Sequence, residues 1–152
     1  MTGWKSDIEY SLSDFATVAR LAGTPISQEE FVAEYMEAPH KPPASLPQGK
    51  MAIYGFWYKG EWLKVGMAGP KSNARYTSQH YNPKSAPSTL AKSLLHDHDF
   101  SYSKSFNANT IGCWIRENCN RVNILMNSAH GLILLALLEA FLHVRLRPRY
   151  ER

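Results

Sequence analysis

The stretch AIYGFWYKGEWLKVGMAGPKSNARYTSQH, residues 52–80, decides the fold that the sequence predicts. Residues 51–58 are rich in aromatic and β-branched side chains, and residues 61–67 alternate between apolar and polar ones, so we expect two strands. Lys59 and Gly60 between them fit a tight turn. The stretch therefore predicts a β-hairpin followed by a helical segment.

Three side chains of this stretch can take part in chemistry, namely Tyr54, Lys64 and Arg75. A Gly-Pro break follows the second strand, and residues 73–81 are expected to form a short helix that carries Arg75. Arginine presents a planar fork of donors that suits a phosphate. Taken singly, each of the three is more often structural: Arg75 as a surface helix residue, Tyr54 as a half-buried core aromatic and Lys64 as a solvated residue on a strand.

The remaining elements follow from hydrophobic periodicity and from turn residues. We expect helices over residues 88–97, 110–118 and 129–144, and a third strand over residues 121–126. The resulting order β, β, α, α, α, β, α predicts an α+β fold with a small, mostly antiparallel three-stranded sheet flanked by helices.

Residues 1–49 are expected to form a helical N-terminal appendage that ends in the Pro-rich linker HKPPASLPQG. Ser11 and Ser13 are candidate N-caps for a first helix, and Ser27 with Glu30 forms a capping box ahead of a second helix, FVAEYM. A helix-turn-helix DNA reader is disfavoured because the second helix is acidic. We therefore interpret this part as a packing or partner surface, and residues 50–152 as a second domain.

Charge is divided unevenly along the chain, whose net charge is +4 over 152 residues. Residues 1–49 hold seven acids and three bases, a sum of −4, and the following residues hold fourteen bases and six acids, a sum of +8. A basic body of this kind is typical of proteins that bind phosphate polymers, although many basic domains do not.

Two cysteines, Cys113 and Cys119, are not spaced with other ligands as in a zinc site, so we expect reduced thiols and a cytoplasmic protein. The apolar run at residues 132–138 is too short to span a bilayer, so we expect no membrane contact. Residues 96–99, His-Asp-His-Asp, are interpreted as a solvated polar turn and not as a metal site.

Glu139 lies within LILLALLEAFLHV, a segment that predicts a helix apolar on nearly every side. A carboxylate in such surroundings is normally neutral, paired or bound to a metal. A partner for it is either His143 one helical turn later, a distant arginine or a divalent cation. The sequence around Glu139 leaves these alternatives open.

The ordered set of AIY at residues 52–54, KVG at residues 64–66, Arg75 and a late glutamate resembles the GIY-YIG nuclease family. The resemblance covers roughly residues 50–150 and is greatest to small type II restriction endonucleases with lysine in place of the second motif tyrosine. It implies an endodeoxyribonuclease that hydrolyses phosphodiester bonds with Mg²⁺ or Mn²⁺, and it makes residues 50–152 the nuclease domain.

The same resemblance implies a role for each of four residues. Tyr54 would be the general base for water, and Lys64 would lower the pKa of Tyr54 or hold that water. Arg75 would bind the scissile phosphate, and Glu139 would hold the metal.

This sequence also departs from the family pattern. The family usually has His or Tyr four residues after the arginine, whereas Gln79 stands there and His80 follows it. We keep His80 and Tyr76 as additional catalytic candidates, and His80 reaches the site only if the helix starts late or is distorted. Ala52 replaces the first motif glycine. The family's asparagine after the glutamate is replaced by a basic tail, which supplies candidate nucleic-acid contacts at Arg145, Arg147 and Arg149.

The expected partner is double-stranded DNA, with a homodimer as the arrangement that would cut both strands. Restriction is the expected biological role. The alternatives are a nuclease of a mobile element, a repair nuclease, a toxin with the same core, or a non-catalytic nucleic-acid-binding module.

Overall fold

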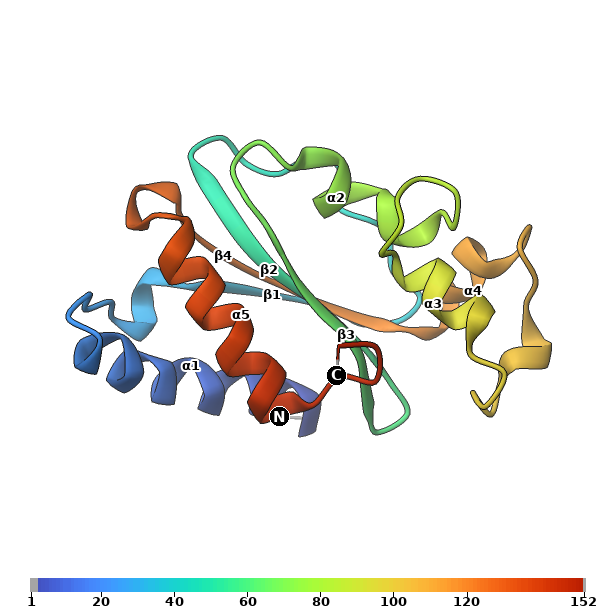
Figure 1. Cartoon of the computed structure of the whole chain (residues 1–152), viewed down its shortest axis with the longest axis horizontal. Coiled ribbons are helices and arrows are strands. Elements are labelled where there is room, and N and C mark those ends of the chain that lie inside the picture. The colour runs from blue at the N-terminus through green and yellow to red at the C-terminus, as the bar shows by residue number, and fades with distance from the viewer. Residues whose placement is uncertain (1–2, 152) are drawn as a thin grey trace.

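A four-stranded antiparallel sheet forms the centre of the computed structural model, which describes residues 3–151 (Figure 1). Within these residues the strand order is β1-β4-β2-β3, so β2 lies inside the sheet and β3 at its edge. The strands are β1 (Val32–Met36), β2 (Lys50–Tyr58), β3 (Glu61–Ala68) and β4 (Asn120–Asn127). The predicted α+β class is confirmed, and the sheet has one strand more than predicted.

Five α-helices lie around the sheet in the described part of the chain. They are α1 (Gly3–Leu21), α2 (Asn73–Thr77), α3 (Leu90–His96), α4 (Ile111–Asn118) and α5 (Leu132–Leu146). Short 3₁₀ turns join several elements, at Gln28–Glu30, Gln79–Tyr81, Ser103–Ser105 and Ser128–His130.

The predicted hairpin of β2 and β3 is present and closes through Lys59 and Gly60. Both residues have positive φ, 44° and 86°, as the favoured two-residue hairpin turn requires. The pairing shifts between Phe56 and Trp57, which leaves Leu63 as an extra residue on β3. This bulge lies next to Lys64, in a position where bulges redirect functional side chains.

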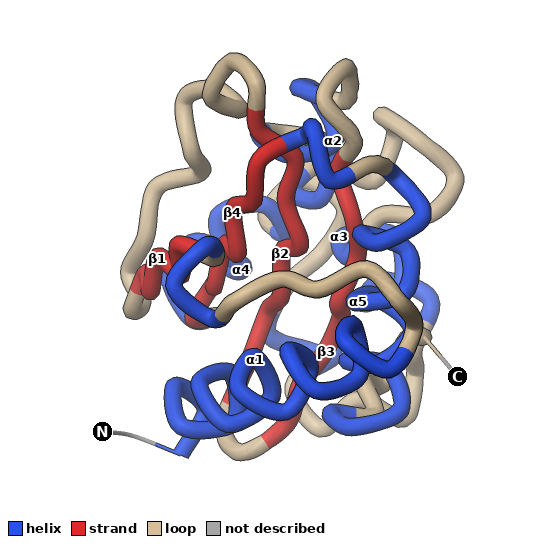
Figure 2. The backbone as a smooth tube through the Cα atoms, turned by 90° about the vertical axis from the view of Figure 1, so that its left-hand side faces the viewer, coloured by secondary structure: helices blue, strands red, loops and turns tan. Residues whose placement is uncertain are grey.

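The sheet separates two hydrophobic cores. α1 and α5 lie side by side on one face (Figure 2), where Ile53 and Val65 pack against them. The opposite face packs against α2, α3 and α4 (Figure 1). Tyr54 and Phe56 belong to the core cluster on that side. Alternation along β2 thus places Tyr54 on the face opposite to α5.

The predicted second helix of the N-terminal part is wrong, because Val32–Met36 forms β1. The capping box of Ser27 and Glu30 is present, but it closes a single 3₁₀ turn. The chain then extends and pairs with β4 in antiparallel register, from Val32 opposite Leu125 to Met36 opposite Arg121. Backbone pairing with an available sheet edge outweighs the local helix signal here.

The first helix begins eight residues before the predicted cap at Ser11. Ser11 is buried in the middle of α1, and its hydroxyl donates to the carbonyl of Asp7 at 2.5 Å. Serine makes this bond inside helices as well as at their ends, which explains the error. Residues of α1, such as Phe15, belong to the same core as α5, so the N-terminal part packs directly on the body.

None of the helices within residues 3–151 is long and apolar enough to cross a membrane.

Candidate active site

Tyr54 is fully buried on β2, directly opposite Gly66 of β3. Its ring lies over the backbone of that glycine, because a Cβ added at Gly66 would lie 2.9 Å from Cε2 of Tyr54 and overlap the hydroxyl. A residue with a side chain at position 66 would therefore displace the tyrosine. The glycine of the second motif is explained by this close approach.

His80 approaches the Tyr54 hydroxyl, with 2.7 Å between Nε2 and the oxygen. The helix that carries Arg75 ends at Thr77, and the chain continues after Ser78 as a 3₁₀ turn. This change of helix type rotates His80 inward, where it is 1% exposed. The distortion on which the sequence interpretation depended is therefore present.

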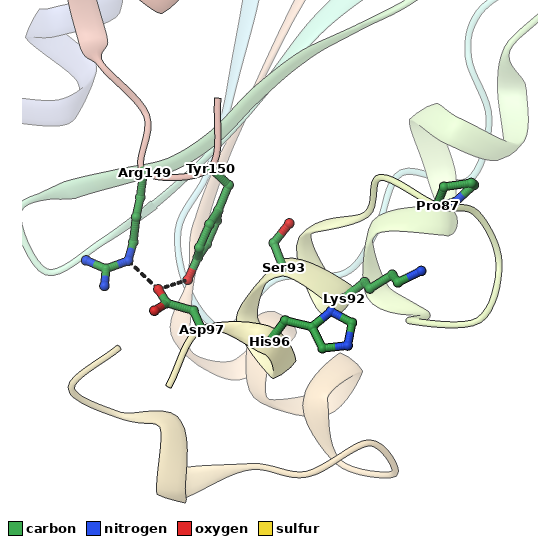
Figure 3. Close-up of a pocket in the computed structure, with 7 residues that line it drawn as sticks. All are labelled: Pro87, Lys92, Ser93, His96, Asp97, Arg149 and Tyr150. Atoms are coloured by element: carbon green, nitrogen blue, oxygen red, sulfur yellow. Dashed lines mark hydrogen bonds and ion pairs between the residues drawn. The ribbon is translucent and has the colours of Figure 1, made fainter. Parts of the chain in front are cut away.

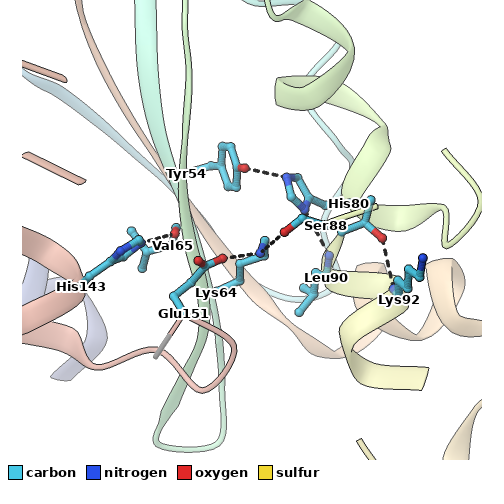
Figure 4. A network of polar contacts seen from close by, with 10 residues as sticks. Tyr54, Lys64, Val65, His80, Ser88, Leu90, Lys92, His143 and Glu151 are labelled. Atoms are coloured by element: carbon cyan, nitrogen blue, oxygen red, sulfur yellow. Dashed lines mark hydrogen bonds and ion pairs between the residues drawn. The ribbon is translucent and has the colours of Figure 1, made fainter. Parts of the chain in front are cut away.

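The tautomer of His80 follows from its second ring nitrogen. The backbone N–H of Leu90 donates to Nδ1 at 3.2 Å, so Nδ1 carries no proton (Figure 4). Burial lowers the pKa of His80 to about 2, and the nearby charges of Arg75, Lys64 and Arg121 act in the same direction. The ring is therefore neutral, its proton is on Nε2, and it donates to the Tyr54 oxygen.

The Tyr54 phenol is held in its protonated form. Burial raises its pKa to about 12, while the charge of Arg75 and a hydrogen bond with Arg75 act in the opposite direction. The negative charges of Glu139 and Glu151 raise the pKa further. Arg75, and not Lys64, is thus the main cation that favours the phenolate of Tyr54.

Lys64 lies on β3 and is 1% exposed, with its ammonium ion-paired to the carboxylate of Glu151 (Figure 4). The hydroxyl of Ser88 is the second acceptor, 3.5 Å from Nζ. A buried ammonium requires such partners, because an unpaired charge away from water is strongly unfavourable. The Lys64 ammonium is therefore in direct contact with a carboxylate of the C-terminal tail.

Glu139 is half-buried on α5, which packs against β3. Burial raises the pKa of its carboxyl, and the charge of Glu151 adds to this effect. The charges of His143 and Arg75 and a hydrogen bond from the Met67 backbone N–H lower it. Glu139 is thus close enough to Arg75 and Glu151 to interact with both.

His143 makes a hydrogen bond with the sheet. Its Nε2 donates to the carbonyl of Val65 at 2.6 Å, which fixes α5 against β3 beside the second motif (Figure 4). This contact places Glu139, one turn earlier on α5, near the same strand. The sequence left His143, a distant arginine and a divalent cation open as partners of Glu139. The charges of His143 and Arg75 both act on the Glu139 carboxyl group.

The donors at Glu139 fit a hard divalent cation with a mostly aqueous shell. Mg²⁺ is commonly held by one or two carboxylates, with waters and a substrate phosphate completing its octahedron. Within residues 3–151, the side chains of His, Cys, Asp and Glu form no group of three or more that could hold a metal. Glu139 is the residue that the resemblance implies would hold the ion.

Tyr76 faces the interior of the protein. It is 1% exposed, and its carbonyl accepts a hydrogen bond of 2.5 Å from Nη2 of Arg121. Burial raises the pKa of Tyr76 to about 12, and the charge of Glu34 contributes. Because Tyr76 follows Arg75 directly, this contact holds the backbone that carries the arginine.

Arg121 is fully buried behind the site, with its guanidinium carbon 5.2 to 5.9 Å from the ring centroids of Tyr54, Phe56, Tyr76 and Tyr81. In the described chain its hydrogen bonds go to uncharged groups, at Asn123, the Tyr81 hydroxyl and the Tyr76 carbonyl. Cation–π contacts thus replace a carboxylate partner for this charge.

The three tail arginines have different surroundings. Arg145 pairs with Asp14 at 2.8 Å, and Arg147 has a left-handed backbone with φ of 49° just after α5. Arg149 pairs with Asp97 at 2.6 Å and with Glu61 at 3.2 Å. Arg145 and Arg149 would have to leave these carboxylates in order to contact a phosphate.

A cavity of about 640 Å³ lies between α3 and the tail (Figure 3), lined by Pro87, Lys92, Ser93, His96, Asp97, Arg149 and Tyr150. Asp97 accepts from Arg149 and, at 2.9 Å, from the Tyr150 hydroxyl. The Arg149 bond is the main cause that lowers the pKa of the Asp97 carboxyl. Within the polar turn at residues 96–99, Asp97 therefore anchors the tail.

Two residues of the site were missed by sequence reasoning. Glu151 was counted within a basic tail, although it is the one acid that follows Glu139 in the sequence. The sequence prediction gives Arg121 no role beyond its place on a strand. A charged residue at the first position of the strand RVNILM is the available signal, since a charged residue that becomes buried needs a specific partner.

Comparisons with known protein families, with curated proteins and with solved structures find no match for this chain.

Proposed function

We propose that this protein is a divalent-metal-dependent DNA endonuclease of GIY-YIG type, with a restriction role as the leading assignment. The observation that carries the proposal is the convergence of Tyr54, Lys64, Arg75 and Glu139, which come from β2, β3, α2 and α5. Arg75 acts on both Tyr54 and Glu139, and Glu151 connects Lys64 with both. Four separate elements thus supply one set of catalytic groups.

Tyr54 is the proposed general base. His80 donates to its oxygen and Arg75 adds a second donor, so both stabilise the phenolate form. A phenolate with these donors can take a proton from water as that water attacks the phosphorus in line with the leaving oxygen. The proton on Nε2 of His80 stays on the ring, because the Leu90 N–H occupies the other nitrogen.

Arg75 and Lys64 supply positive charge for the phosphate. Arg75 is half-buried and forked, which suits two oxygens of a phosphodiester in the transition state. A divalent cation held by Glu139 would supply Lewis-acid stabilisation of the developing negative charge. The sum of +8 for residues 50–152 supports attraction of the DNA backbone.

A test is relaxation of supercoiled plasmid DNA with Mg²⁺ by the wild type and Glu139→Gln. Glu117→Gln is the matched control, because it removes the same charge from another helix, α4. We expect nicking and linearisation by the wild type and the control, and loss of about 10² to 10³ in rate for Glu139→Gln. Cleavage by none of the proteins, or equal cleavage by all, contradicts the proposal.

The proposed setting is the cytoplasm, with double-stranded DNA as substrate and a homodimer as the form that cuts both strands. Cys113 and Cys119 are free thiols, which agrees with a reducing compartment. Cleavage of plasmid DNA into discrete fragments would favour restriction, whereas a smear of fragments of many sizes would favour a toxin or a general nuclease.

A further inference from the structure

Residues 149–151 of the C-terminal tail run along the edge strand β3, and Glu151 lies at the proposed catalytic centre. The backbone N–H of Arg149 donates to the carbonyl of Trp62 at 2.9 Å, and that of Tyr150 donates to Leu63 at 3.1 Å. The side chains of Arg149 and Tyr150 are fixed by Asp97 (Figure 3). Glu151 is therefore held next to Lys64 by a backbone that is hydrogen-bonded to β3.

Glu151 fills the anion-binding position of Lys64. The Lys64 side chain is 1% exposed and that of Glu151 is 23% exposed, so the carboxylate lies between the ammonium and solvent. Figure 4 shows the carboxylate reaching Lys64 from the tail on the side opposite to Ser88. An incoming anion would meet the ammonium where the carboxylate now lies.

We propose that the Lys64 ammonium is an anion subsite of the catalytic centre, which Glu151 occupies in the DNA-free protein and a DNA phosphate takes over on binding. This inference rests on the proposed nuclease function and adds to it an intramolecular competitor for the contact of Lys64 with the phosphate. The exchange replaces one anion by another, so Lys64 is never left buried without a partner.

The exchange requires little movement of the chain. Glu151 follows the two residues whose backbones bond to β3, and its own side chain is partly exposed. Rotation of that side chain away from Lys64 leaves the bonds of Arg149 and Tyr150 in place. The anchored tail thus makes Glu151 a local competitor at high effective concentration.

The test measures DNA binding without cleavage, by fluorescence anisotropy in EDTA with a labelled mixed-sequence duplex of about 20 base pairs. Glu151→Gln is compared with Glu61→Gln, which removes the same charge three residues before Lys64 and leaves the Lys64 pair intact. We expect Glu151→Gln to bind about tenfold more tightly than the control, since it removes the competitor. Thermal unfolding of each variant verifies folding, and Glu151→Ala serves as a second variant.

A double-mutant cycle assigns the gain to Lys64. In a Lys64→Met background, Glu151→Gln should increase DNA affinity no more than Glu61→Gln does, because the subsite no longer exists. A gain that persists in that background overturns the inference, as does equal or weaker binding by Glu151→Gln and Glu151→Ala. Those results leave the nuclease assignment intact if the wild type cleaves plasmid, whereas absence of both binding and cleavage overturns both proposals.

Discussion

The hydroxyl of Tyr54 accepts a hydrogen bond from Nε2 of His80 across 2.7 Å, and this is the central contact of the candidate site. The Leu90 N–H on Nδ1 fixes the direction of that bond. The histidine is therefore a neutral donor to the tyrosine oxygen and not the base that takes its proton.

Stability should fall as the solution is acidified from pH 6.5, because two buried histidines are neutral in the fold. The pKa of His80 is lowered to about 2 and that of His40 to about 4, both mainly by burial, from ordinary values near 6.5. Between the lowered pKa values and 6.5 the unfolded chain binds more protons than the folded protein, so stability rises with pH and is complete about one pH unit above 6.5. Each histidine should remove about 2 kcal/mol between pH 7.5 and 5.

Urea unfolding at about pH 7.5 and about pH 5 measures this loss. His80→Gln and His40→Gln should each flatten the pH dependence of the unfolding free energy, whereas His98→Gln, at an exposed position, should leave it unchanged. A wild-type protein equally stable at both pH values would show that these rings are not buried in neutral form.

Gly66→Ala should disturb Tyr54 without touching its chemistry. The new Cβ would overlap the Tyr54 ring, so we expect a loss of about 1 to 3 kcal/mol in the free energy of unfolding. Gly3→Ala is the control, since nothing lies within 4 Å of the position of its Cβ. Equal stability of the two variants in denaturant unfolding would contradict the close approach.

Arg75→Lys should separate binding from catalysis. Lysine keeps the charge but lacks the planar fork, so single-turnover cleavage should slow by about 10² or more while duplex affinity changes little. Arg20→Lys, on an exposed part of α1, should match the wild type. A pure loss of affinity with an unchanged cleavage rate would assign Arg75 to DNA binding alone.

The hairpin was predictable because its signals are local. Alternation, aromatic content and a Lys-Gly turn act within a few residues of one another, and the structure has both strands with the expected turn. β1 was not predictable in the same way, since residues 32–36 become a strand by pairing with β4, which lies almost ninety residues later in the chain.

The same distinction between local sequence signals and tertiary packing applies to the residues of the candidate site. Tyr54, Lys64, Arg75 and Glu139 could be selected from their order in the sequence. The orientation of His80 depends on a change from α to 3₁₀ winding after Thr77, and the position of Glu151 depends on backbone bonds to β3. Both are properties of tertiary packing, which no local pattern encodes.

The most direct measurement follows cleavage of a labelled duplex in ¹⁸O-water with Mg²⁺, by the wild type and Tyr54→Phe under single-turnover conditions. Tyr58→Phe, on the same strand and the same face of the sheet, is the control. We predict one ¹⁸O atom in each new terminal phosphate and a rate about 10² to 10⁴ lower for Tyr54→Phe alone. Equal rates for Tyr54→Phe and the wild type, or an absence of cleavage by the wild type, would contradict the role of Tyr54 as the base of a hydrolytic site.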